Sequence, residues 1–100
     1  MHGSVKEIVD SQVEAAENLV GRLGYIMSKR NEDCVVYAAK EDPERGFVCT
    51  PNEEGELRVI AFYKSLPELS DRNVMTIHRL KIVRMFEAAR KGLRIVKDAE

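Results

Sequence analysis

The sequence has no tryptophan, only 6% aromatic residues and no long apolar run. Its longest apolar run covers residues 34–39, whereas a membrane-spanning helix needs about 20 apolar residues. The N-terminus also lacks the basic segment followed by an apolar segment that is typical of a signal peptide. These absences predict a cytoplasmic protein without a membrane partner. The scarcity of aromatic residues further predicts a core made of aliphatic side chains.

Motifs that carry well-known chemistry are missing as well. The chain contains no G-x-x-x-x-G-K-[ST], G-x-G-x-x-G or H-E-x-x-H motif. Cys34 and Cys49 do not form the close pair that zinc sites usually contain, and His78 has no histidine partner nearby. The sequence therefore predicts no catalytic residue, no metal site and no cofactor, and an enzyme that uses His78 with a cysteine is the least favoured hypothesis. We expect two free thiols, with Cys49 facing about Lys40 across a hairpin, and a hydrogen-bonded core position for His78.

Length and composition fit a single domain covering residues 1–100. Hydrophobic residues make up 44% of the chain, which is an ordinary share for a globular protein, and charged residues make up 33%, which is above the usual quarter. A chain of this length buries enough surface to form a core without disulfides or metals.

A long amphipathic helix is predicted at the N-terminal end. Ser4 and Glu7 have the spacing of a capping box, and apolar residues then recur three or four positions apart. Two endings fit this pattern. Gly24 can end the helix, so that residues 25–29 form a first strand, or the helix can continue to about residue 28 because the apolar positions stay in phase. We favour the longer helix.

Three strands and a second long helix follow. The predicted strands cover residues 34–39, 47–50 and 57–64, and the last helix covers about 73–97. The predicted fold class is therefore α+β, in the order α-β-β-β-α. We expect an antiparallel meander of three strands, or of four strands if residues 25–29 form a strand, with the helices packed on one face.

Charge is distributed unevenly along the chain. Residues 1–71 contain eight Lys or Arg and fourteen Asp or Glu, whereas residues 72–97 contain eight Lys or Arg and one Glu. At helical spacing the last helix divides into a core face, a basic strip and a second apolar side. The core face consists of Val74, Met75, Ile82, Met85, Phe86, Ala89, Leu93 and Val96. The basic strip consists of Arg79, Arg84, Arg90, Lys91, Arg94 and Lys97. The second apolar side consists of Ile77, Leu80, Val83 and Ile95.

The two outward sides of this helix lead to different functional hypotheses. Apolar residues on a second side are typical of an interface, so we predict a small non-enzymatic interaction or regulatory module that forms a homodimer through its helices or binds a protein partner. The alternative is a nucleic-acid-binding protein whose basic strip contacts about six phosphates. We favour the first hypothesis, because no aromatic residues lie among the basic ones to stack on bases.

Overall fold

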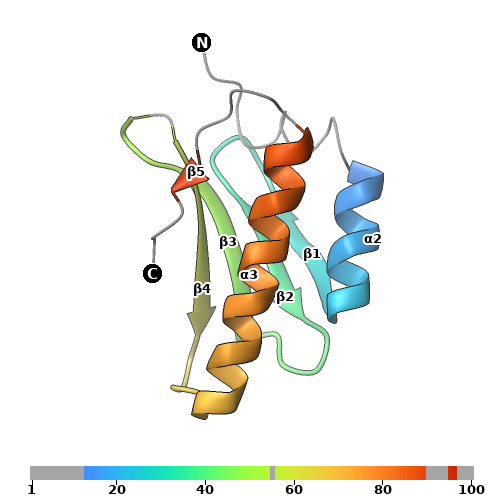
Figure 1. Ribbon diagram of the computed structural model, residues 1–100, viewed down its shortest axis with the longest axis vertical. Coiled ribbons are helices and arrows are strands. Elements are labelled where there is room, and N and C mark those ends of the chain that lie inside the picture. The colour runs from blue at the N-terminus through green and yellow to red at the C-terminus, as the bar shows by residue number, and fades with distance from the viewer. Residues whose placement is uncertain (1–12, 55, 90–94, 97–100) are drawn as a thin grey trace.

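The computed structural model of the protein describes residues 13–54, 56–89 and 95–96. Within these residues the elements run, in chain order, α2 (Val13–Leu23), β1 (Tyr25–Arg30), β2 (Val35–Ala39), β3 (Arg45–Pro51), β4 (Leu57–Tyr63), α3 (Leu69–Ala89) and β5 (Ile95–Val96) (Figure 1). The predicted α+β fold class is confirmed. The N-terminal helix is described over 11 residues, and the capping box of Ser4 and Glu7 lies outside the described part of the chain.

The four longer strands form an antiparallel meander in which each strand pairs with the next one along the chain. The segment that the sequence analysis left open between helix and strand provides the first of these strands, so the meander has four strands rather than three. β5 then pairs with the outer edge of β4 in parallel, where Ile95 lies opposite Leu57.

Gly24 ends α2 and turns the chain directly into β1. Its φ of 96° lies in the left-handed region that favours glycine. Its N–H donates to the carbonyl three residues earlier, and Tyr25 then pairs with Ala39 of β2. The prediction that the helix continues to about residue 28 is wrong. Apolar residues at these positions fit helical spacing, but their burial alternates as in a strand. Tyr25 is buried, Ile26 is exposed and Met27 packs against the core.

The last helix begins earlier and is described over a shorter stretch than predicted. α3 starts at Leu69 instead of about residue 73 and is described to Ala89, and residues 90–94 lie outside the described part. The prediction of helix through residue 97 is wrong, because Ile95 and Val96 form β5. Both residues are β-branched and favour strands, and they pair with an edge that β4 would otherwise leave open.

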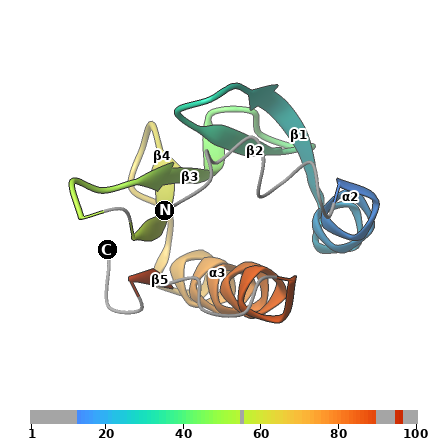
Figure 2. The same cartoon turned by 90° about the horizontal axis from the view of Figure 1, so that it is seen from above.

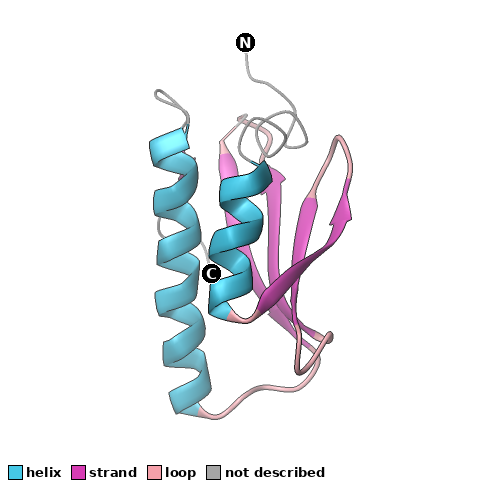
Figure 3. Ribbon diagram, turned by 90° about the vertical axis from the view of Figure 1, so that its right-hand side faces the viewer, coloured by secondary structure: helices cyan, strands magenta, loops and turns pink. Residues whose placement is uncertain are grey.

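The two helices lie on the same face of the sheet, as predicted, so the described part of the molecule has two layers (Figures 2 and 3). The core fills the space between the layers and contains aromatic side chains from both. Tyr25, Tyr37, Phe47 and Phe86 are all buried, which is four of the six aromatic residues of the chain. The prediction of an aliphatic core is therefore wrong in this respect, because a few aromatic rings fill a large share of a small core. Neither α2 nor α3 is both long enough and apolar enough to cross a membrane.

Candidate functional site

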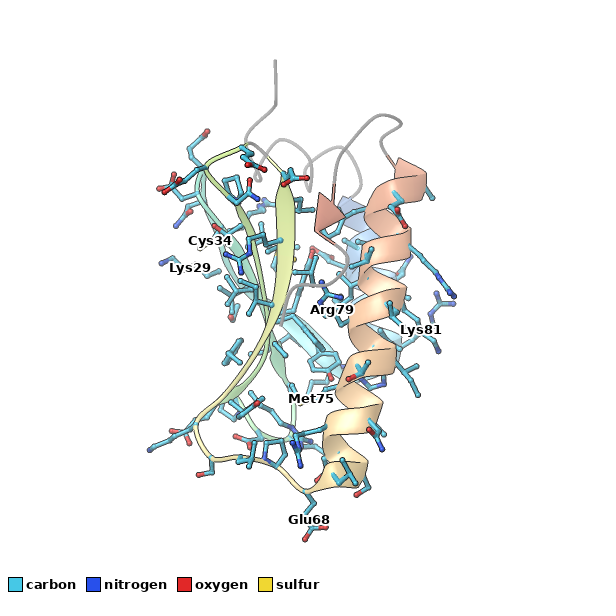
Figure 4. The ribbon with its side chains drawn as sticks, turned by 60° about the vertical axis from the view of Figure 1, so that its left-hand side comes forward. Lys29, Cys34, Glu68, Met75, Arg79 and Lys81 are labelled. Carbon is cyan, nitrogen blue, oxygen red and sulfur yellow. The ribbon has the colours of Figure 1, made fainter. Side chains whose placement is uncertain are left out.

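One side of α3 packs on the sheet and defines its orientation. Met75, Ile82 and Phe86 are buried, and Met85 packs against the same core (Figure 4 shows Met75 between the helix and the sheet). These four positions were predicted correctly. Val74 was not, because its side chain is 47% exposed, one helical position away from Met75. The structure does not describe the side chains of the other predicted core residues, Ala89, Leu93 and Val96.

Arg79 belongs to this buried side and not to a basic strip. Its side chain is 9% exposed, and its Nε–H donates to the Val59 carbonyl of β4. The prediction that Arg79 contacts phosphate is therefore wrong, because its guanidinium faces the protein's own sheet. Arg84 is exposed as predicted, and Lys81 is exposed as well and points away from the sheet (Figure 4). Four residues of the predicted strip lie outside the described part of the chain: Arg90, Lys91, Arg94 and Lys97.

The side of α3 that faces away from the sheet carries a line of exposed residues, which we call the outer face of α3. It consists of Leu69, Asn73, Ile77, Leu80 and Arg84. These residues are three or four positions apart, so all five fall within about 80° of the helix circumference. Leu69 is 64% exposed, Ile77 53% and Leu80 41%. Large apolar side chains thus occupy three of its five positions.

The outer face of α3 contains only two of the four residues predicted as an interface. Ile77 and Leu80 are exposed, as that prediction requires. Val83 is 3% exposed and packs in the core beside Phe86, so its assignment to an interface is wrong. Ile95 lies in β5 and not on the helix, so it cannot extend the same surface.

His78 joins the middle of α3 to the start of β1. Its Nδ1 lies 2.7 Å from the Tyr25 hydroxyl, and the two rings are perpendicular to each other at 5.4 Å between centroids. Burial and, to a smaller extent, the charge of Lys81 lower the pKa of His78 from its ordinary value. The side chain is half-buried and hydrogen-bonded, which agrees with the role predicted for it.

A cleft of about 250 Å³ opens beside this hydrogen bond. It lies where the end of α2, the starts of β1 and β3, the end of β2 and the first half of α3 meet. Its apolar lining includes Leu23 and Met75, and its polar lining includes Tyr25, His78 and Arg45. This cleft was not predicted from the sequence, because its residues are separated by up to 55 positions in the chain and share no motif.

Both cysteines are free, as predicted, but their strand register differs from the prediction. Cys49 is opposite Val35 instead of Lys40, because β2 and β3 pair with a five-residue shift from the expected hairpin. Cys49 is buried, and this burial raises the pKa of its thiol. Cys34 is half-buried on the face of the sheet away from α3 (Figure 4).

That face of the sheet is a second apolar surface of the described part of the molecule, and it was not predicted from the sequence. Ile26, Val36, Val48, Ile60 and Phe62 alternate with core residues along their strands and are exposed or half-buried. The signal was present in residues 57–64, where the positions on both sides of the strand are mostly apolar. Such a pattern is typical of strands covered on both faces.

The part of the chain that the structure describes contains no group of three or more His, Cys, Asp or Glu side chains arranged to hold a metal ion. Comparisons of the chain with known protein families, with curated proteins and with solved structures find no match.

Proposed function

We propose that this protein is a non-enzymatic interaction module that self-associates through the outer face of α3. The observation that carries the proposal is the exposure of Leu69, Ile77 and Leu80 along one line of a helix whose opposite side is already anchored to the sheet. Exposed apolar side chains gathered on one surface are typical of a contact with another protein. A second copy of the chain presents the same surface, so two copies can cover each other's exposed apolar side chains without any other molecule.

The charges of α3 favour an antiparallel pair of helices. Glu68 precedes the first turn of the helix and Arg84 lies near its described end, about equally far from Ile77 along the axis. An antiparallel arrangement with Ile77 near the two-fold axis brings Glu68 of one copy close to Arg84 of the other, twice in each dimer. Leu80 then packs against Asn73 of the second copy, and Leu69 packs against the aliphatic part of Arg84. A parallel arrangement would place Glu68 beside Glu68 of the second copy and Arg84 beside Arg84, so that like charges face each other.

The size of this surface predicts a weak dimer. From Leu69 to Arg84 the helix extends about 22 Å, and its width with side chains is about 10 Å. A stable interface buries about 800 Å² of each partner, so contact along one helix falls below that size. We therefore expect a monomer–dimer equilibrium that responds to protein concentration, and not a permanent dimer.

The alternative of nucleic-acid binding has less support. Within the described residues, the predicted basic strip keeps Arg84 and is joined by Lys81, whereas Arg79 is buried. Arg72 of α3 is exposed as well, but on another side of the helix. So few cations on one surface provide a small electrostatic contribution to duplex binding, because affinity depends on the number of phosphates neutralised.

A charge-reversal experiment tests the proposed pairing. Arg84→Glu should raise the dimer dissociation constant about tenfold at low salt, since it places two like-charged pairs in the interface. Glu68→Arg should weaken the dimer similarly, and the double variant should restore most of the affinity. Arg22→Glu, at an exposed position of α2, is the matched control. Sedimentation equilibrium measures all four, and loss of affinity without restoration in the double variant would contradict the antiparallel pairing.

A further inference from the structure

We propose that the cleft beside Tyr25 and His78 is a binding site for a small monocarboxylate with an apolar body. The cleft is distinct from the outer face of α3. Its residues come from both helices and from three strands, so the folded chain must assemble before the site exists. The cleft has polar lining residues, apolar lining residues and a defined size, and each restricts the ligand.

Arg45 supplies the group that recognises the carboxylate. It lies at the start of β3 and is half-buried, and it lines the cleft. Within the described residues, its guanidinium makes no hydrogen bond or ion pair, although Glu41 and Asp71 line the same cleft. A guanidinium keeps its charge at any ordinary pH and offers paired N–H donors that match a carboxylate. A half-buried guanidinium with no anionic partner among the described residues is suited to bind a carboxylate.

The Tyr25–His78 pair adds a neutral polar wall near this charge. Arg45 lies close enough to Tyr25 for its charge to oppose the rise that burial produces in the tyrosine pKa. The hydrogen bond to the Tyr25 hydroxyl fixes the orientation of the His78 ring. The two side chains can thus orient a bound carboxylate through hydrogen bonding without adding a second fixed charge.

The apolar lining and the volume of the cleft determine which kind of uncharged body the ligand can have. Leu23, Ala39 and Met75 line it, and these side chains suit an aliphatic or aromatic body. A volume of about 250 Å³ is at the small end for ligand sites. A molecule of benzoate size fits this space, and a nucleotide does not.

The rim makes the site selective for a single negative charge. Lys40 and Arg45 are balanced by Glu41 and Asp71, so the lining as a whole is electrically neutral at pH 7 when His78 is uncharged. A phosphate or a dicarboxylate would bring its second charge towards these two carboxylates, and like charges at short range repel. A monocarboxylate can place its one charge on Arg45 alone.

Titration of the full-length protein with sodium benzoate, followed by amide chemical shifts in NMR spectra, tests this site. We expect saturable shifts around Tyr25, Arg45 and His78, at millimolar affinity because the ligand is small. Benzamide has nearly the same shape without the charge, and it should bind at least about tenfold more weakly. Inorganic phosphate should not compete.

Two variants assign the site to the cleft. Arg45→Met should reduce benzoate affinity about tenfold or more, whereas Arg58→Met, on β4 and away from the cleft, should leave it unchanged. Equal binding of benzamide and benzoate to the unmodified protein would overturn the proposal even if Arg45→Met did not fold. Shifts that do not saturate in the unmodified protein, or that reach half-saturation at the same benzoate concentration in a folded Arg45→Met protein, would overturn it as well.

Discussion

The Nε–H of Arg79 donates to the carbonyl of Val59, and this hydrogen bond ties the middle of α3 to β4. Because Arg79 is buried against the sheet, residues about half a helical turn away from it must face outwards. Ile77 is in that position, and Leu80, about 100° around the helix from Arg79, lies on the same outward side. A single buried arginine therefore helps to determine which apolar side chains of α3 belong to the core and which remain on the surface.

Replacing Arg79 by methionine should destabilise the fold. The substitution removes a charged donor and leaves the Val59 carbonyl without it, which costs about 1.5–3 kcal/mol of unfolding free energy for a hydrogen bond of this kind. Lys81→Met is the matched control, because Lys81 is exposed on the same helix and lies outside the outer face of α3, and its effect should stay within about 0.5 kcal/mol. Urea unfolding of the two variants measures both values, and equal effects would show that the Arg79 contact does not stabilise the fold.

Replacing Tyr37 by phenylalanine should stabilise the protein. The ring of Tyr37 is fully buried, and among the described residues its hydroxyl has no hydrogen-bond partner. Removing an unsatisfied buried hydroxyl should add about 1 kcal/mol, which corresponds to a rise in Tm of about 4–8 °C for a domain of this size. Tyr25→Phe is the counterpart, since it removes a hydroxyl that is bonded to His78, and it should lower Tm. A fall in Tm for Tyr37→Phe would indicate that its hydroxyl is satisfied.

Stability should fall as the pH drops through the range in which His78 titrates. The folded protein lowers the pKa of His78 below 6.5, so just below that pH the unfolded chain binds more protons than the folded one. The contribution of His78 is thus complete above about pH 6.5 and is lost on acidification. Comparison of Tm between about pH 7.5 and 5.5 for the unmodified protein and His78→Gln isolates this contribution, because all other ionisable groups are shared. A smaller acid loss in the unmodified protein than in the variant would contradict the sign.

The two thiols should differ in reactivity. Cys49 is buried and its pKa is raised, so it should form little of the reactive thiolate in the native state, whereas Cys34 is half-buried. We expect one thiol to react rapidly with a thiol reagent in the folded protein and two in denaturant. Cys34→Ser should abolish the rapid reaction, and two rapid native thiols would show that Cys49 is accessible.

Local patterns in the sequence predicted most of the elements of this fold. The β-branched residues of β2 and β4 indicated strands, and the helical spacing of Met75, Ile82 and Phe86 identified the buried side of α3. The end of α2 was not predicted correctly, because Ile26 and Met27 continue the helical spacing of α2 while Tyr25 and Met27 also fit the inward face of a strand. A positive φ at Gly24 decides between the two, and spacing does not report it.

The candidate sites depended more strongly on tertiary structure. Ile77 and Leu80 were recognised from spacing alone. Arg79 was misassigned because a charged side chain is usually exposed, and only the position of β4 shows that a strand carbonyl accepts from it. The cleft could not be predicted, because Tyr25, Arg45 and His78 come together only when β1, β3 and α3 have packed.

The most direct test of self-association is size-exclusion chromatography with light scattering on three proteins over a range of concentrations: the unmodified chain, Leu80→Glu and Ile26→Glu. Both substitutions place a carboxylate at a similarly exposed apolar position, one on the outer face of α3 and one on the face of the sheet away from α3. The mass of the unmodified protein and of Ile26→Glu should rise above 11.4 kDa with concentration. The mass of Leu80→Glu should stay at 11.4 kDa. A DNA duplex at low salt should change none of these masses. A monomeric unmodified protein at every concentration, an unchanged dimer in Leu80→Glu, or a duplex complex that dissociates as salt rises would contradict the proposed function.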